Sequence, residues 1–107
     1  MKKQIIVTTS WDDGHKLDLK LAKLLKKYGM RGNFYISPKN REFREEDLLS
    51  DDEIKKLSRD FEIGAHTITH PRLTKMSEKQ AFNEIIESKK YLEKEDINGA
   101  VIVKFVL

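Results

Sequence analysis

Residues 4–15 read Gln-Ile-Ile-Val-Thr-Thr-Ser-Trp-Asp-Asp-Gly-His, a nearly unbroken β-branched run followed at once by a polar cluster. Such a run is typical of a strand buried on both faces of a parallel sheet. We therefore predict a buried strand over residues 4–9, which ends at the cluster of residues 10–15. The pair Asp12 and Asp13 then follows the strand, in the kind of loop where parallel α/β folds place their sites.

The remainder of the chain alternates short β-rich runs with longer stretches of helical spacing. This alternation predicts an α/β fold with a parallel βαβαβαβ array. Apolar residues recur at helical spacing from Leu17 to Tyr28, which predicts a helix with one apolar face. Gly29 occupies the position of a left-handed residue after this helix. Two capping boxes, at Ser50 and Ser77, predict the starts of two further helices. Strands are expected at residues 30–36, 61–65 and 100–107, the last after a turn at Asn98-Gly99.

Residues 37–49 are predicted to form a long loop with a turn of helix near Glu45 to Leu49. The loop is longer than a simple connection between a strand and a helix requires, and long loops often line sites. The charged run from Arg41 to Asp47 lies within it. We interpret this run, like the lysines of the first helix, as solvated surface.

The composition limits the chain to one soluble globular domain. Its 107 residues include 21 Lys and Arg against 18 Asp and Glu, and 38% of them are hydrophobic. There is no cysteine, so a metal would have to bind His and carboxylate side chains. The longest apolar run, Ala100 to Val103, is far shorter than the ~18 residues of a membrane span, and no signal-type stretch follows the start. We therefore expect a cytoplasmic protein without a membrane partner. Nucleic acid is not expected as a partner either, because no basic patch is interleaved with aromatic residues.

Asp12 and Asp13 have two interpretations. With Gly14 they fit an ordinary turn whose Asp caps the next helix. Two adjacent carboxylates also repel each other, so a site that keeps both ionised usually supplies a cation. In that case one carboxylate would bind the metal while the other remained free to act as a base.

His66 and His70 follow the strand expected at residues 61–65 and also have two interpretations. They fit two polar loop residues, since a pair of histidines four apart is a weak signal. One helical turn would instead place both on the same side, and Pro71 disfavours its continuation. An Asp with two His forms a facial triad that leaves coordination positions open, as in a catalytic metal site.

Together the two motifs resemble those of the polysaccharide deacetylases, carbohydrate esterase family four, also called the NodB-homology domain. The first is a strand with Thr-x-x-Asp-Asp-Gly, and the second is His-Thr-x-x-His-Pro after another strand. The runs Asn33-Phe34-Tyr35-Ile36 and Phe61-Glu62-Ile63-Gly64-Ala65 fall where that family has them. The resemblance therefore extends over nearly the whole chain.

The resemblance implies a role for each motif residue. It makes Asp12 the catalytic base, and it makes Asp13, His66 and His70 the ligands of a divalent metal. Zinc is the default ion, with iron, cobalt or nickel as alternatives. The implied reaction is metal-dependent hydrolysis of the N-acetyl group of a carbohydrate, and the motifs do not distinguish a polysaccharide from peptidoglycan or a small acetylated sugar.

The same resemblance implies a truncated domain. The family's barrel has seven strands, and its later motifs, which carry an orienting Arg and the general acid, have no counterpart before Leu107. We therefore expect residues 1–107 to form one truncated deacetylase-like domain, half of a (β/α) barrel, with impaired or incomplete activity. The alternative is a non-catalytic fragment that binds a metal or a partner chain. Because a half barrel leaves strand edges open, we also expect a homo-oligomer or a complex with a chain that completes the barrel.

Overall fold

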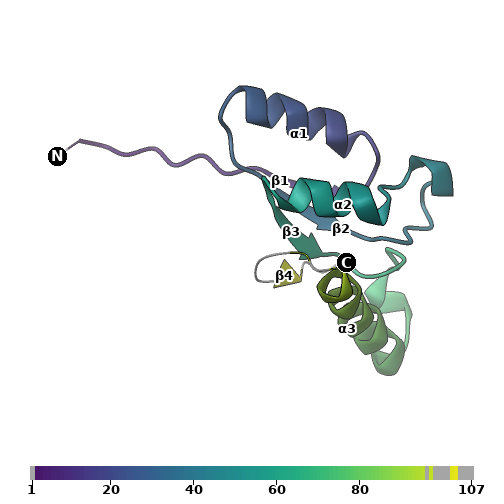
Figure 1. Ribbon diagram of the computed structural model, residues 1–107. Helices are drawn as coiled ribbons and strands as arrows, with labels where there is room; N and C mark the ends of the chain where they lie inside the picture. The colour runs from purple at the N-terminus through teal and green to yellow at the C-terminus, as the bar shows by residue number, and fades with distance from the viewer. Residues whose placement is uncertain (1, 96, 98–101, 104–107) are drawn as a thin grey trace.

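The computed structural model describes residues 2–95, 97 and 102–103, in which parallel strands alternate with helices (Figure 1). This order confirms the predicted α/β class. The described elements are β1 (Ser10–Asp13), α1 (Asp18–Lys27), β2 (Asn33–Ile36), α2 (Asp51–Ser58), β3 (Glu62–Ala65), α3 (Glu78–Lys94) and β4 (Ile102–Val103), with the 3-10 turns η1 (Glu45–Asp47) and η2 (Leu73–Lys75).

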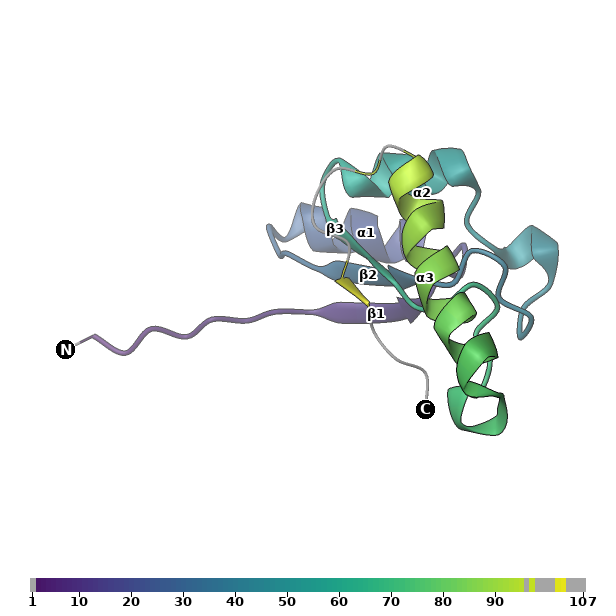
Figure 2. The same ribbon diagram turned by 90° about the horizontal axis from the view of Figure 1, so that it is seen from below.

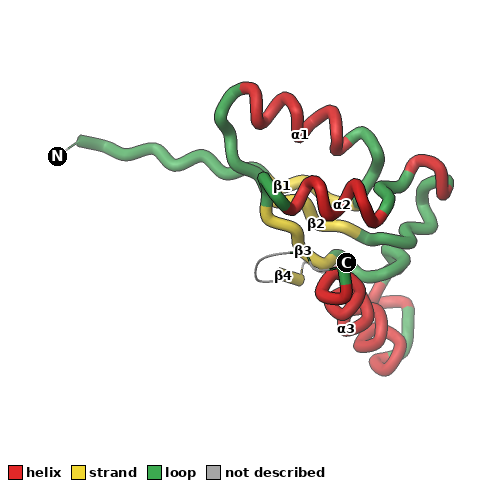
Figure 3. The backbone as a smooth tube through the Cα atoms, viewed as in Figure 1, coloured by secondary structure: helices red, strands yellow, loops and turns green. Residues whose placement is uncertain are grey.

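The strands form one parallel sheet in the order β1-β2-β3-β4. Helices α1 and α2 contact each other, and both α2 and α3 contact β3 (Figures 1 and 2). In the register of β2, Ile36 pairs with Asp13 on one side and with Ala65 on the other. Because the strands run in the same direction, the loops that follow β1, β2 and β3, green in Figure 3, lie at one edge of the sheet.

The first strand differs from its prediction in position and burial. The predicted buried strand over residues 4–9 is wrong: β1 begins at Ser10, and Figures 1 and 2 show the preceding segment running away from the sheet. In that segment Ile5 is 87% exposed. The neighbouring strand β2 is the reason, because it begins only at Asn33, the partner of Ser10, and is preceded by the turn after α1. Residues before Ser10 therefore have no β2 residue to pair with in a strand. An apolar run forms a buried strand only where a paired neighbour exists.

The helix boundaries agree with the sequence. Both capping boxes form, with Ser50 accepting from the backbone N–H of Glu53 and Ser77 from that of Gln80. Gly29 has a φ of 64°, in the left-handed region that glycine adopts without a steric penalty. The predicted turn of helix in the long loop is η1. Local residue chemistry thus accounts for the starts of α2 and α3 and for the end of α1.

The buried faces of the helices agree less well. In the predicted stripe of α1, Leu25 is buried, but three members are exposed: Leu17, Leu24 and Tyr28. On α3, Leu92 is fully buried while Phe82 is 61% exposed. Periodicity identifies an apolar side of a helix, but the position of the neighbouring elements decides which part of that side is covered. None of the described helices combines the length and apolarity needed to cross a bilayer.

The core lies where the sheet meets the helices. Phe34 of β2 is fully buried and meets Phe61 edge-on at 5.2 Å between ring centroids. The largest fully buried apolar side chains are Phe34, Ile36, Ile54 and Leu92. Of the predicted last strand, only β4 is described, so the turn at residues 98–99 and the rest of residues 100–107 lie outside the described residues.

Candidate functional site

Two predicted site segments meet at the carboxyl edge of the sheet. Asp13 is the last residue of β1, and His66 directly follows Ala65, the last residue of β3. The pairing of Ile36 with both Asp13 and Ala65 places these strand ends in line, and the N–H of His66 donates to the carbonyl of Ile36 at 3.2 Å. Sheet register thus joins motifs that are distant in sequence.

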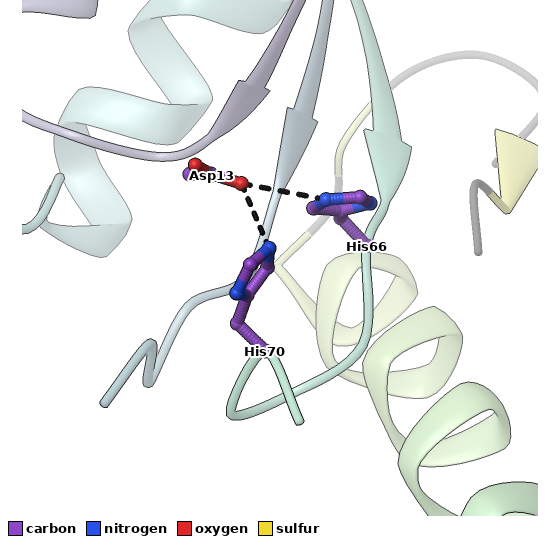
Figure 4. Close-up of side chains that lie close together, drawn as sticks. All are labelled: Asp13, His66 and His70. Atoms are coloured by element: carbon purple, nitrogen blue, oxygen red, sulfur yellow. Dashed lines mark ion pairs between the residues drawn. The ribbon is translucent and has the colours of Figure 1, made fainter. Parts of the chain in front are cut away.

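The carboxylate of Asp13 faces two imidazoles (Figure 4). Its Oδ1 lies 3.0 Å from Nε2 of His70 and 3.4 Å from Nε2 of His66. One donor atom from each residue lies within 4.8 Å of the others. The side chain of Asp13 is 31% exposed, that of His70 14% and that of His66 5%. The two histidines are therefore largely buried, and Asp13 is the member of the group that solvent reaches most.

This donor set fits a divalent metal. Zinc binds nitrogen and oxygen donors at about 2.0–2.2 Å, so two donors of one ion stand roughly 3–3.5 Å apart. The two spacings to the Asp13 oxygen, 3.0 and 3.4 Å, lie in that range. Two imidazoles and one carboxylate also leave coordination positions open for water or substrate. The structure brings together the three residues that the sequence predicted as ligands.

The backbone around Asp13 departs from strand geometry. Asp13 itself has a φ of 89°, a region that non-glycine residues enter at a cost of about 1–3 kcal/mol. Gly14 follows with a φ of 83°, and a Cβ at this position would lie 2.9 Å from Cγ2 of Ile36. Asn40, only 2% exposed, donates its side-chain N–H to the carbonyl of Asp13 at 3.4 Å. These contacts hold the strand end in the bend that turns Asp13 toward the histidines.

The segment between the two histidines is an irregular loop, and the helical turn considered from the sequence does not form. Thr67 and His70 have φ values of 68° and 60°, and the hydroxyl of Thr67 accepts the N–H of His70 at 3.2 Å. Two left-handed residues therefore bring the rings together, with centroids 5.1 Å apart. The spacing of the histidines suggested their proximity, but not the backbone that produces it.

Glu84 of α3 clamps this loop. One carboxylate oxygen accepts the backbone N–H groups of Ile68 at 2.8 Å and Thr69 at 3.1 Å, and the other accepts the hydroxyl of Thr69 at 2.7 Å. No sequence motif singled out Glu84. The available signal was its position on the side of α3 that also carries Ser88 and Leu92, where a part-buried carboxylate requires hydrogen-bond donors.

Asp12, the predicted base, lies beside the ligand group and is not a member of it. It precedes Asp13 on β1 and is exposed. The negative charges of Asp12 and Asp13 both raise the pKa of the nearby carboxyl group of Asp18. The structure therefore places a solvent-accessible carboxylate directly before Asp13 on β1.

Asp18, in the first turn of α1, is a buried carboxyl group. It is 9% exposed, and its Oδ2 has no hydrogen-bond partner among the described residues. Burial, followed by the negative charges of Asp13 and Asp12, raises its pKa from 3.8 to about 6. The folded chain therefore favours the neutral form of Asp18 up to about pH 6.

We predict that Asp18 lowers the stability of the metal-free chain as the pH rises. Because the pKa of Asp18 is raised on folding, the folded chain keeps a proton that the unfolded chain releases. The contribution of Asp18 to the free energy of unfolding therefore declines from about pH 4 to about pH 6 and stays lost at higher pH. Asp18→Asn should thus gain stability over the wild type across this window. Urea unfolding in the presence of a chelator measures the difference at each pH.

The exposed variant Glu46→Gln serves as the control and should follow the wild-type profile. A constant difference in unfolding free energy between wild type and Asp18→Asn from pH 4 to pH 7 would contradict the prediction.

Comparisons with known proteins agree with the fold. The deacetylase PplD of Streptococcus pyogenes, solved in complex with acetate, matches with a TM-score of 0.76 at 22% identity, over 88% of this chain and 42% of that one. The peptidoglycan deacetylase PdaC of Bacillus subtilis matches with a TM-score of 0.72 at 22% identity, over 92% and 48%. A polysaccharide deacetylase of Bacillus cereus matches with a TM-score of 0.69 at 29% identity, over 90% and 31%.

This chain spans less than half the length of each of these three structures. A search of curated protein sequences finds no match. The sequence profile of the polysaccharide deacetylase family, by contrast, matches residues 1–99, nearly the whole chain. The chain belongs to the polysaccharide deacetylase family.

Proposed function

We propose that this chain provides the metal-binding part of a hydrolase that removes N-acetyl groups from a carbohydrate. The observation that carries the proposal is the convergence of Nε2 of His66 and Nε2 of His70 on one oxygen of Asp13. The family and the fold support a carbohydrate deacetylase-like function at this coarse level.

In the proposed mechanism Asp13, His66 and His70 hold a divalent ion, with zinc as the default and iron, cobalt or nickel as alternatives. When bound, such an ion supplies Lewis acidity, which polarises an amide carbonyl and acidifies water. Asp12 accepts the proton of the attacking water. Its exposure and its place next to Asp13 support this role, because a base must reach solvent and substrate together.

The leaving amine requires a proton, a role that a histidine outside the candidate ligand set could fill. His15 is the remaining histidine, but its Nδ1 accepts the N–H of Leu17 at 3.0 Å and its ring packs edge-on against Phe43. Neither contact directs it to the ligand group. We therefore propose that the activity of this chain alone is impaired or incomplete.

A second candidate function is a non-catalytic one, in which the chain binds a metal or another subunit. The edge of the sheet favours it. Among the described residues β1 has one strand neighbour, β2, and the segment before β1 exposes Ile5 at 87%, Ile6 at 78% and Val7 at 64%. An edge with exposed apolar residues is a template for pairing with another strand.

We predict that the chain binds about one divalent metal per molecule through the three candidate ligands. Asp13→Ala and His66→Ala should each lose the stoichiometric metal, because either change leaves only two protein donors. Elemental analysis after dialysis against zinc measures the content. His15→Ala is the matched control and should retain it, and a wild-type level of metal in the Asp13→Ala variant would exclude this ligand set.

Asp12 is predicted to be the most important residue for hydrolysis that does not bind the metal. Asp12→Asn should lower the release of acetate from an N-acetylated sugar oligomer by about 10²–10⁴-fold, the usual contribution of a general base, with the metal content unchanged. Asp52→Asn, an exposed carboxylate on α2, is the control. Full activity of the Asp12→Asn variant would exclude its role, and a metal-loaded wild type without any activity would favour the non-catalytic alternative.

We also predict that the exposed edge is covered in solution, by a second copy of this chain or by a chain that completes the barrel. Light scattering after gel filtration should give a mass above that of one chain, since among the described strands β1 pairs with β2 alone, and the segment before β1 leaves Ile5, Ile6 and Val7 in water. Replacing Ile6 by Lys should shift the mass toward the monomer. A wild-type chain that is a stable monomer at micromolar concentration would refute this prediction.

A further inference from the structure

The loop between β2 and α2 places a carboxylate at the outer nitrogen of His70. Oε1 of Glu42 lies 3.3 Å from Nδ1 of His70, while Nε2 of the same ring lies 3.0 Å from Asp13. That Nδ1 is buried and has no hydrogen-bond partner among the described residues, although Glu42 lies within ion-pair distance. We propose that Glu42 is a positioning residue that accepts the Nδ1 proton of His70 and thereby keeps Nε2 free to bind the metal.

This role rests on the metal site proposed above and follows from the chemistry of imidazole. A neutral ring carries its proton on one of two nitrogens, and only the unprotonated nitrogen binds a metal. Ligating histidines usually donate their other N–H to a carboxylate, a carbonyl or water, which selects the tautomer and fixes the ring. For His70 the group at that position is Glu42.

The backbone holds Glu42 in place against the histidine loop. Its N–H donates to Oδ1 of Asn40 at 2.9 Å, and Asn40 is the same buried side chain that donates to the carbonyl of Asp13. The preceding N–H, of Arg41, donates to the carbonyl of Thr69 at 3.2 Å. One loop segment thus contacts both the strand end that carries Asp13 and the segment that carries His70, so the position of Glu42 is coupled to both ligands.

The interpretation of the charged run from Arg41 to Asp47 as solvated surface is therefore incomplete. The side chain of Glu42 is 61% exposed, as expected of surface, but its carboxylate faces a buried ring nitrogen. Loss of such an outer partner typically weakens metal binding by about 10–100-fold. Solvent screens an exposed carboxylate, so we expect the lower end of this range, about tenfold.

The test compares Glu42→Ala with Glu46→Ala. Glu46 lies on the same loop, is 68% exposed and faces Arg44, so its removal takes away the same charge without touching a histidine. The full chain is titrated with zinc against a chromogenic chelator. We expect Glu42→Ala to raise the dissociation constant about tenfold, Glu46→Ala to leave it unchanged, and Glu42→Gln, which keeps a neutral acceptor, to fall between them.

A second measurement separates positioning from general destabilisation. In the zinc-loaded chain with ¹⁵N-labelled histidine, the Nδ1 proton of His70 should be visible in the wild type and in Glu46→Ala. It should be lost to exchange with water in Glu42→Ala.

Two results would overturn the proposal in distinguishable ways. Equal zinc affinity and an unchanged His70 signal in Glu42→Ala would remove the role of Glu42 alone. A wild-type chain that binds no zinc would remove the metal site and this role with it.

Discussion

The parallel pairing of β2 with β1 on one side and β3 on the other is the constraint on which the site depends. Ile36 at the end of β2 is in register with both Asp13 and Ala65. The ends of β1 and β3 therefore lie side by side with the end of β2, at the same edge of the sheet. A shift of one residue in either pairing would turn the following side chain to the other face of the sheet. Phe34, fully buried in the inner strand β2, anchors this register in the core.

The site is built at the cost of unfavourable backbone conformations. Asp13, Thr67 and His70 are the non-glycine residues with positive φ among those described, and all three belong to the site or to the loop that carries it. Each such residue costs about 1–3 kcal/mol and persists only where its surroundings hold it. Here the holding contacts come from Asn40 in one loop and Glu84 on α3. Strain concentrated at a convergence of donors is typical of functional sites.

The edge strand β1 carries one of the three candidate ligands. The chain aligns with less than half of each similar structure reported above, and β1 is the edge strand of its described sheet. Asp13, one of the three candidate ligands, lies at the end of this edge strand. A further strand that paired with β1 would therefore lie next to Asp12 and Asp13.

The sequence alone determined the α/β class, the helix starts and the identity of the residues that converge at the site. These features depend on local signals: alternating periodicity, capping boxes such as that at Ser50, and the chemistry of Asp and His side chains. It did not determine that the apolar run before Ser10 remains exposed, or that Glu84 and Glu42 contact the histidine loop. Those outcomes depend on which distant segments become neighbours, since a strand needs a paired partner and a carboxylate needs donors that only tertiary packing brings within reach.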